Sequence, residues 1–246
     1  MKKILVFGAS SKLAQVTIKH FKSDGTELFL SGSDEMKLKT VSDELTTLNP
    51  NIKTHLFQLN ALEFDRHQEL FDKAIDSMGE IDCVFIAHGT LPNQEEVQKS
   101  ASESIKEFHI NCTSFISLCS IAGNYFESKN KGTIAVIASV AGDRGRQSNY
   151  IYGSAKGAVA LFLQGLRNRL FKSNVNVVTI KPGMVETPMT AHMPKGLLFA
   201  KPEPVGKAIY KAIISGKDVA YIPGFWKLIM FIIRNIPEGV FKKLSL

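Results

Sequence analysis

The sequence predicts an α/β protein in which one parallel sheet is covered by helices on both faces. Three observations predict this fold class. Short apolar runs alternate with longer amphipathic segments along most of the chain, as they do in strands joined by crossover helices. The first apolar run ends at a glycine that leads into a helix-like segment. The 246 residues, 44% of them hydrophobic, can bury one sizeable core, and no linker-like stretch divides them.

The expected elements follow in order from these signals. The strands are the apolar runs at residues 3–7, 28–30, 52–59, 82–87, 133–138, 175–180 and 219–222. The helices are the segments at residues 12–21, 35–48, 63–78, 94–102, 104–128, 150–171 and 203–215. Serines after Gly8 cap the first helix, Pro50 lies beyond the second helix, and Gly79 stops the third. The sixth strand ends at Pro182 and Gly183, and an irregular loop over residues 184–201 follows.

Small or polar residues recur where the expected strands end. These residues are Gly8, Ser31, Asn60, Ala87, Ser139 and Pro182. In open parallel sheets, ligands bind beyond the carboxyl ends of the strands, so six separate segments converge on one expected site.

The net charge of +7 is spread unevenly along the chain. Residues 201–246 contain eight Lys or Arg against three Asp or Glu, which is +5 and leaves +2 for the first 200 residues. The basic excess therefore belongs to the C-terminal segment, and we expect no nucleic-acid partner.

The three cysteines, Cys83, Cys112 and Cys119, fall in apolar segments and lack CxxC spacing. We expect buried thiols in a reducing compartment, with neither disulfides nor a metal site. The apolar run after Lys3 is too short for the core of a secretory signal, which predicts a cytoplasmic protein.

One pair of residues points to chemistry on an oxygen atom. Tyr152 and Lys156 lie four residues apart in an expected helix, so they share one face, and Ser139 ends an apolar strand thirteen residues before the tyrosine. A phenol has a reference pKa of about 10, and an ammonium beside it favours the phenolate. The three residues suit proton exchange with an oxygen whose carbon gains or loses hydride.

These residues and this layout resemble the short-chain dehydrogenase/reductase family over residues 1–222, which implies a single Rossmann-type, doubly wound domain. The resemblance implies the catalytic set Asn111, Ser139, Tyr152 and Lys156. Tyr152 would be the general acid/base, Ser139 would orient the carbonyl or alcohol, Lys156 would lower the pKa of the tyrosine and hold the nicotinamide ribose, and Asn111 would support a water-linked proton path.

The resemblance also implies a set of cofactor-binding positions. They are Gly8, Ser10, Ser11, Lys12, Leu13, Ser33, Asn60, Ala61, Ala87, Gly89, Tyr152, Lys156, Pro182, Gly183, Val185 and Thr187. The family's glycine-rich turn retains only Gly8 here, and Lys12 replaces a glycine near the phosphates, although Ala14 still allows close helix packing. In the loop after the fourth strand only Gly89 is kept, and we interpret His88 as a packed loop residue rather than a catalytic base.

The cofactor preference depends on the end of the second strand. NAD-specific members usually carry an acid there, whereas this chain has Ser31, Gly32 and Ser33. Ser11, Lys12 and Ser33 suit a 2′-phosphate, so we expect NADP(H), with NAD(H) held without the acidic contact as the alternative.

A narrower resemblance concerns the loop after Ser139 and the segment AHGTLPNQ. They are similar to reductases of polyprenyl-phosphate-linked or cell-envelope keto sugars, of the decaprenylphosphoryl 2-keto-pentose reductase type. We expect Asp143, Arg144 and Arg146 to grip a polar or phosphorylated substrate. The alternative is a loop that only caps the sheet or joins a subunit interface.

The C-terminal segment over residues 223–246 is expected to be an apolar and basic helical extension of the same domain. It contains the only tryptophan, and its apolar run is far shorter than the ~20 residues that span a bilayer. Lys227 and Arg234 lie two helical turns apart on one face, as in a helix lying on an anionic membrane. The alternatives are that it lines the substrate cleft or packs against another subunit.

Together these expectations describe an NADPH-dependent carbonyl reductase acting on a small-molecule or lipid-linked substrate, with no metal. It would be cytoplasmic, with possible peripheral contact with the inner membrane face through residues 225–246, and a homodimer or homotetramer by resemblance to the family. The alternatives are a reductase of acyl or other hydrophobic ketones, and an NADP-binding regulator or scaffold with little turnover.

Overall fold

Seven parallel strands form one sheet in the computed structural model, which describes residues 1–244. The strands are β1 (Lys3–Phe7), β2 (Glu27–Gly32), β3 (Lys53–Gln58), β4 (Cys83–Ile86), β5 (Gly132–Ile137), β6 (Val175–Pro182) and β7 (Val219–Ile222). Their order is β3-β2-β1-β4-β5-β6-β7, and each neighbouring pair is parallel. The order reverses between β1 and β4, so a ligand crevice is expected beyond their carboxyl ends.

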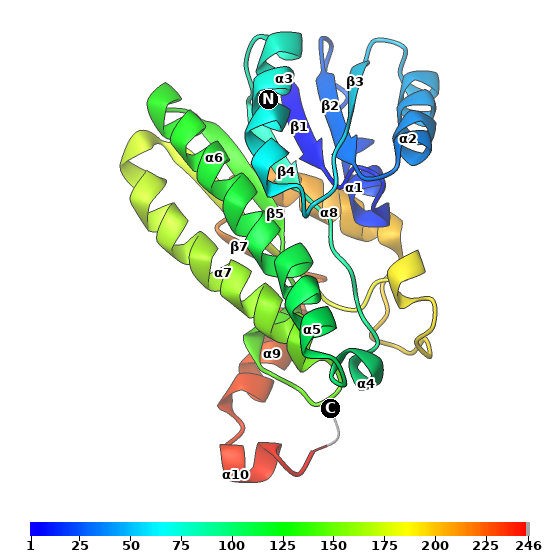
Figure 1. The fold of residues 1–246 in the computed structure, drawn as a ribbon, viewed down its shortest axis with the longest axis vertical. Helices are drawn as coiled ribbons and strands as arrows, with labels where there is room; N and C mark the ends of the chain where they lie inside the picture. Colours follow the sequence, from blue (N-terminus) through cyan, green and yellow to red (C-terminus); the bar gives the residue numbers. More distant parts are fainter. Residues whose placement is uncertain (245–246) are drawn as a thin grey trace.

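Helices cover both faces of the sheet (Figure 1). They are α1 (Lys12–Ile18), α2 (Glu35–Leu48), α3 (His67–Met78), α4 (Gln94–Val97), α5 (Ala101–Phe108), α6 (Ser114–Lys129), α7 (Tyr150–Leu170), α8 (Pro202–Ile214), α9 (Trp226–Asn235) and α10 (Glu238–Phe241). Alternate residues of β1 feed two cores: Ile4 packs with α1, α2 and α8, and Leu5 packs with α3, α6 and α7. The doubly wound fold predicted from the alternating pattern is confirmed.

The largest departure from the expected elements lies between β4 and β5. Instead of helices over residues 94–102 and 104–128, α4 ends at Val97, and Ser100 caps α5 by accepting a hydrogen bond from the Glu103 amide. A π-helical segment, His109–Thr113, then joins α5 to α6. The expected first helix also ends early, at Ile18. Helix boundaries set by one capping side chain are poorly defined by hydrophobic periodicity.

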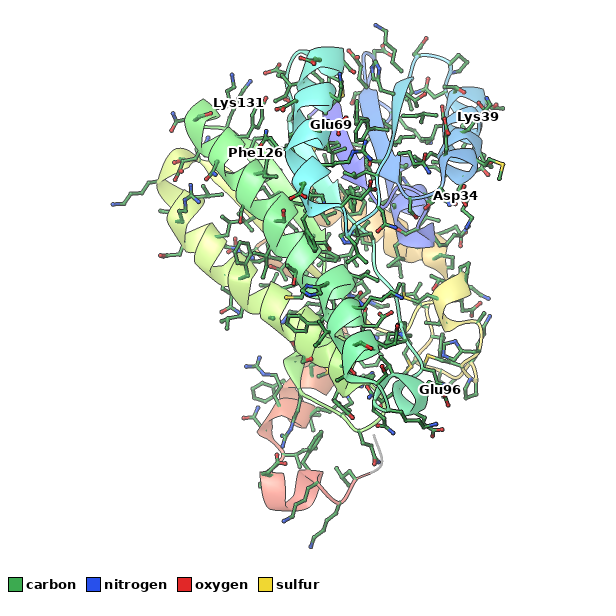
Figure 2. All side chains as sticks on the ribbon, in the orientation of Figure 1. Asp34, Lys39, Glu69, Glu96, Phe126 and Lys131 are labelled. Atoms are coloured by element: carbon green, nitrogen blue, oxygen red, sulfur yellow. The ribbon has the colours of Figure 1, made fainter. Side chains whose placement is uncertain are left out.

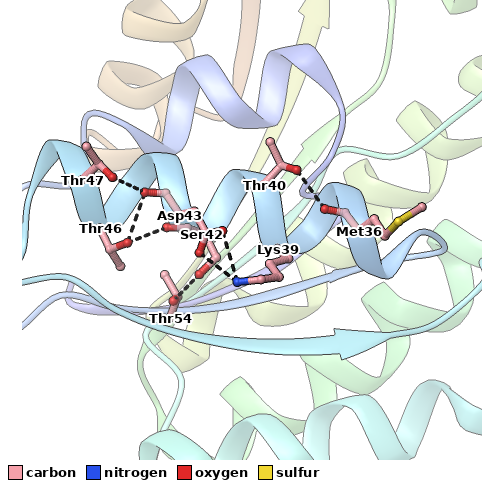
Figure 3. Close-up of polar contacts among 8 residues, drawn as sticks. All are labelled: Met36, Lys39, Thr40, Ser42, Asp43, Thr46, Thr47 and Thr54. Atoms are coloured by element: carbon pink, nitrogen blue, oxygen red, sulfur yellow. Dashed lines mark hydrogen bonds and ion pairs between the residues drawn. The ribbon is translucent and has the colours of Figure 1, made fainter.

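Polar side chains fasten α2 to the edge of the sheet (Figure 3). The Ser42 and Thr54 hydroxyls hydrogen-bond at 2.7 Å, joining α2 to β3, and Lys39 pairs with Asp43 one turn along the helix. Figure 2 labels Lys39 and Lys131, whose side chains are exposed, and Phe126 of α6, whose side chain is buried.

The C-terminal segment forms α9 and α10, at the bottom of Figure 1. Trp226 and Met230 are buried against Val140, while Leu228 and Phe231 remain exposed on the outer face of α9. Among residues 1–244, no helix is long and apolar enough to cross a membrane.

Candidate active site

A cavity of about 760 Å³ extends along the carboxyl edge of the sheet. Its walls come from the β1–α1 turn, the ends of β2 to β6, the start of α7, the loop after β6 and α9. All sixteen expected cofactor-binding residues line it, as do the expected catalytic residues Ser139, Tyr152 and Lys156. The structure therefore brings together in one cavity segments that the sequence places up to 180 residues apart, from Gly8 to Thr187.

The β1–α1 turn requires glycine at its first position. Gly8 has φ +81, and a Cβ there would lie 2.4 Å from the backbone nitrogen of His88. The amides of Gly8 and Ala9 both donate to the Ser31 carbonyl, which ties the turn to β2. Ser11 caps α1, since its hydroxyl accepts from the Ala14 amide at 3.2 Å, as expected from the sequence. Among the described residues, the amides of Lys12 and Leu13 at the start of α1 have no backbone or capping partner, and both residues line the cavity, which suits a phosphate group.

Lys12, which stands where the family has a glycine, leaves this turn intact. It is the first residue of α1 and lines the cavity, with its ammonium 3.9 Å from the Glu203 carboxylate. Ala14 is fully buried, so α1 packs closely on the sheet without the family's last glycine.

Ser139 and Tyr152 meet because the loop after β5 lies directly on α7. A Cβ on Gly142 would fall 2.5 Å from the Gly157 nitrogen, and a Cβ on Gly153 would fall 2.9 Å from the Ala141 carbonyl oxygen. Only glycines allow this approach, which brings the Ser139 hydroxyl within hydrogen-bonding reach of the Tyr152 phenol. The glycines within YGSAKG thus serve the geometry of the site.

The electrostatics of this pair differ from the expectation. Burial raises the pKa of Tyr152 to about 12, and the hydrogen bond from Ser139 offsets only part of that effect. Burial also lowers the pKa of Lys156 to about 7. The Lys156 ammonium donates to the Ile137 carbonyl at 3.2 Å and lies 3.9 Å from the centre of the Phe115 ring. In the protein without cofactor, Lys156 does not lower the pKa of Tyr152, because the lysine is itself desolvated and donates to the Ile137 carbonyl. Its role with cofactor and substrate bound stays a prediction.

Asn111 is the one expected catalytic residue that does not line the cavity. It is fully buried in the π-helical segment, where its side chain donates to the Thr90 hydroxyl at 2.9 Å and accepts from the Thr90 amide. It also donates to Glu107, both to the carbonyl and to the carboxylate. A Cβ on Gly89 would lie 2.8 Å from Asn111 Oδ1 and 3.5 Å from Lys156 Nζ, so Asn111 holds the loop beside Lys156.

His88 is a packed loop residue, consistent with the interpretation from the sequence. Its ring stacks on Phe115 with centroids 4.1 Å apart, and its Nε2 hydrogen-bonds the Ser114 hydroxyl at 2.7 Å. Burial holds the pKa of His88 well below its usual value, so the ring stays neutral.

The loop after Ser139 does not present its charges as expected. Asp143 binds the Lys181 ammonium and the Tyr221 hydroxyl beneath the cavity. Arg144 donates to the Ile233 and Ile236 carbonyls and pairs with Glu238, so it holds the C-terminal segment. The prediction that Asp143 and Arg144 grip substrate is therefore wrong, since both are engaged within the protein; Arg146 alone of the three lines the cavity.

Several cavity-lining residues were not singled out from the sequence. Trp226 was expected at a membrane interface, with the substrate cleft as an alternative; it is 2% exposed, lines the cavity and covers Gly183, where a Cβ would lie 1.8 Å from Trp226 Nε1. Asn149 and Lys37 also line the cavity. Nothing in the local sequence marks Asn149, whereas the uniqueness of Trp226 and its place beyond the last strand were available signals.

The cysteines and metal-ligating residues take no part in this site. Cys83, Cys112 and Cys119 are free and buried, and burial raises the pKa of each thiol. Within residues 1–244, no group of three or more His, Cys, Asp or Glu side chains is placed to hold a metal ion.

Comparison with known proteins identifies related sequences and folds. The family model described as short chain dehydrogenase matches residues 2–197. An uncharacterized oxidoreductase in the mprA 5′ region of Streptomyces coelicolor is 28% identical over 244 residues, which cover 98% of this chain and 95% of the relative. An uncharacterized oxidoreductase of Mycobacterium tuberculosis is 25% identical over 243 residues, covering 98% and 96%.

Two solved structures share the fold. The crystal structure of levodione reductase superposes with a TM-score of 0.83 at 17% identity, covering 92% of this chain and 98% of that one. A short-chain dehydrogenase from Sphingobium yanoikuyae in complex with NADPH gives a TM-score of 0.81 at 18% identity, covering 97% and 98%.

Proposed function

The chain belongs to the short-chain dehydrogenase family and is an oxidoreductase of that type, and from this premise we propose that it is an NADPH-dependent reductase that converts a ketone to an alcohol. The observation that carries the proposal is that one cavity is lined both by the Gly8 turn and by Ser139, Tyr152 and Lys156.

The proposed roles follow from what each side chain can donate. The Ser139 hydroxyl and the Tyr152 phenol hydrogen-bond the carbonyl oxygen, which polarises the C=O bond. When bound, NADPH supplies a hydride to the carbonyl carbon. As the carbon gains this hydride, Tyr152 transfers its phenolic proton to the oxygen, and the alcohol and a phenolate result. Lys156, beside Tyr152, stabilises that phenolate when protonated, and the phenolate regains its proton from solvent.

The cavity walls fit a dinucleotide. A Cβ at Gly8 would fill the close approach between β1 and the loop at His88, and the capped start of α1 offers backbone donors for the phosphates. We propose that the sixteen cofactor-binding residues named from the sequence hold the nucleotide, since all of them line the cavity. They include Asn60 and Ala61 beyond β3, and Val185 and Thr187 beyond β6. Asn111, which does not line the cavity, would hold the Gly89 loop beside Lys156.

The preference for NADP(H) rests on the side chains around the end of β2. Ser11, Lys12, Ser33 and Lys37 line the cavity there. Two carboxylates approach these ammonium groups: Asp34 caps α2 and pairs with Lys37 at 3.3 Å, and Glu203 lies 3.9 Å from Lys12, but neither acid lines the cavity. Hydroxyls and ammonium groups in the cavity wall suit a 2′-phosphate, which would compete with these two carboxylates for the lysines.

The C-terminal segment favours a lipid-linked substrate, such as a cell-envelope keto sugar, over a small hydrophobic ketone. The inner face of α9 lines the cavity through Trp226, while Leu228, Phe231 and Ile232 are exposed on its outer face beside the basic Lys227. We propose that residues 223–246 extend the same domain and touch the inner membrane face, where an apolar carrier would enter. Anionic vesicles should float wild-type protein and not a Leu228→Ser, Phe231→Ser variant; flotation of both would count against membrane contact.

Self-association into a homodimer or homotetramer is supported by apolar residues on another side of the molecule. Leu161 on α7 and Phe171 just beyond it are 68% and 80% exposed. An oligomer that buries them is the expected state, and light scattering would measure it.

The test of the proposed function is a titration with NADPH and, in parallel, NADH, followed by nicotinamide fluorescence. We expect NADPH to bind at least about tenfold more tightly, since a charge-assisted contact contributes roughly 1.5–3 kcal/mol. Lys37→Met should weaken NADPH binding and leave NADH binding unchanged. Arg169→Met, which removes a charge from the outer side of α7, should change neither. Binding of neither nucleotide would refute the proposal and leave the regulator or scaffold function.

A further inference from the structure

Buried polar atoms without partners belong to four residues that line the cavity. Arg146 Nε, Asn149 Oδ1 and Trp226 Nε1 have no hydrogen-bond partner among residues 1–244, and all three residues line the cavity. A buried polar group that lacks a partner costs about 1–3 kcal/mol, so such atoms in a cavity wall indicate a missing ligand. The fourth residue, His88, packs against Gly8 at the β1–α1 turn.

Arg146 and Trp226 belong to one continuous patch of wall. The Arg146 guanidinium has only marginal contacts, 3.5 Å to the Val140 carbonyl and 3.8 Å to the Met230 sulfur. Val140 and Met230 pack in the same cluster as Trp226, which is held over Gly183. The protein therefore holds the Arg146 guanidinium with only marginal contacts beside the Trp226 side chain, whose Nε1 packs against Gly183.

Among residues 1–244, Arg146 has no carboxylate of its own to balance its positive charge. Asp143 is the acid that acts on it, yet that carboxylate already binds the Lys181 ammonium and the Tyr221 hydroxyl. Two cations thus share one anion, which leaves one positive charge beside the cavity. Burial lowers the pKa of Arg146, although a guanidinium keeps its proton at neutral pH.

We propose that Arg146, beside the Trp226 side chain, binds an anionic group, a carboxylate or a phosphate, on the ketone that the enzyme reduces. The guanidinium donates to such an oxygen, and the anion supplies a counter-charge. Asn149 offers an acceptor, so the same substrate carries a hydroxyl near that group. These three residues form the anion subsite, and the substrate class is a hydroxylated ketone with a negative charge. This inference rests on the proposed reductase function and narrows its substrate.

Trp226 allows the subsite to be tested without turnover, because it is the only tryptophan in the chain. Its fluorescence reports on a ligand bound in the cavity beside its side chain. The probes are two matched pairs of ketones: dihydroxyacetone phosphate against dihydroxyacetone, and 4-oxopentanoate against its methyl ester. The full chain is titrated with each probe, with and without saturating NADP⁺, which occupies the phosphate-binding end. The two pairs distinguish a phosphate site from a carboxylate site.

We expect a saturable change in Trp226 fluorescence with at least one charged probe and binding of its neutral partner about 10- to 100-fold weaker. Arg146→Met should abolish that difference, and Arg146→Lys should retain part of it. Lys227→Met is the matched control, since it removes an exposed charge from the residue next to Trp226 and should leave the difference intact.

Equal binding of the charged and neutral probes in both pairs would overturn the anion subsite, as would an unchanged difference in Arg146→Met. Either result combined with tight NADPH binding would leave the reductase function standing. Loss of NADPH binding in the wild type, measured separately by nicotinamide fluorescence, would instead refute the proposed function.

Discussion

The two ends of the cavity are built in different ways. The phosphate-binding end is formed by backbone and small side chains of consecutive residues, with Gly8 and Ser11 fixed by contacts to β2 and α1. The other end is formed by large side chains from distant segments, with Arg146 in the loop after β5 and Trp226 on α9. A local motif therefore identifies the first end, whereas the second exists only once the C-terminal segment packs against the loop after β5.

The largest effect is expected where the two ends meet, at Tyr152. Tyr152→Phe removes the only proposed proton donor and keeps the ring, so kcat should fall by about 10²-fold to 10⁴-fold while NADPH binding changes little. The measurement is NADPH consumption with the ketone of the probe panel that is reduced fastest. Tyr150→Phe is the control, since Tyr150 is exposed and its hydroxyl reaches only Gln98. Equal loss in both variants would contradict the role of Tyr152.

Alanine at Gly8 tests the phosphate-binding end, and alanine at Gly165, which does not line the cavity, is the control. Gly8→Ala places a Cβ against the His88 backbone at a positive φ, so it should lower the free energy of unfolding by about 1–3 kcal/mol and prevent nucleotide binding. Gly165→Ala, in open space on α7, should stabilise by up to about 1 kcal/mol. Chemical denaturation measures both.

In Gly183→Ala the added Cβ would clash with the Trp226 indole, a side chain, whereas in Gly8→Ala it would clash with backbone. Gly183→Ala should displace α9 and shift the Trp226 emission toward that of an exposed indole, with the rest of the domain folded. An unshifted emission would show that α9 does not depend on this contact.

The sequence predicts the phosphate-binding end well, for reasons visible in particular residues. Gly8, Ser11 and Ala14 sit in a contiguous pattern whose geometry is local, and the alternation of strands and helices predicts the sheet. Trp226 and Arg144 could not be placed in the same way, because their partners lie about 40 and 90 residues away in sequence. The charged loop was interpreted as substrate-binding, whereas Asp143 and Arg144 use their charges to hold Lys181 and the C-terminal segment.

The pH dependence of stability tests the burial of Lys156. The folded pKa of about 7 lies below the usual 10.5, so between these values the unfolded chain binds the extra proton and the free energy of unfolding rises with pH. Relative to the Lys156→Met variant, the free energy of unfolding of the wild type should rise by at most about 1.4 kcal/mol per pH unit between these two pKa values. Denaturant titrations at several pH values measure it, and parallel curves for the two proteins would contradict the buried, desolvated lysine.

The smallest effect is expected at Arg144, which fastens the C-terminal segment. Arg144→Met removes its donors to the Ile233 and Ile236 carbonyls and the contact of its guanidinium with the Phe241 ring at 3.7 Å. Stability should fall by roughly 1–2 kcal/mol, with faster proteolysis within α9 and α10. Arg169→Met, which breaks an exposed ion pair with Glu127, should cost less than about 1 kcal/mol. An equal loss of stability in Arg144→Met and Arg169→Met would contradict the role of Arg144 in holding the C-terminal segment.

The most direct test of the account measures energy transfer from Trp226 to the nicotinamide of bound NADPH. If the cofactor lies in the cavity that α9 closes, NADPH should quench Trp226 and emit on tryptophan excitation, and Trp226→Phe should lose this emission yet bind NADPH when the nicotinamide is excited directly. NADPH binding that leaves Trp226 fluorescence unchanged would contradict a single cavity shared by cofactor and C-terminal segment.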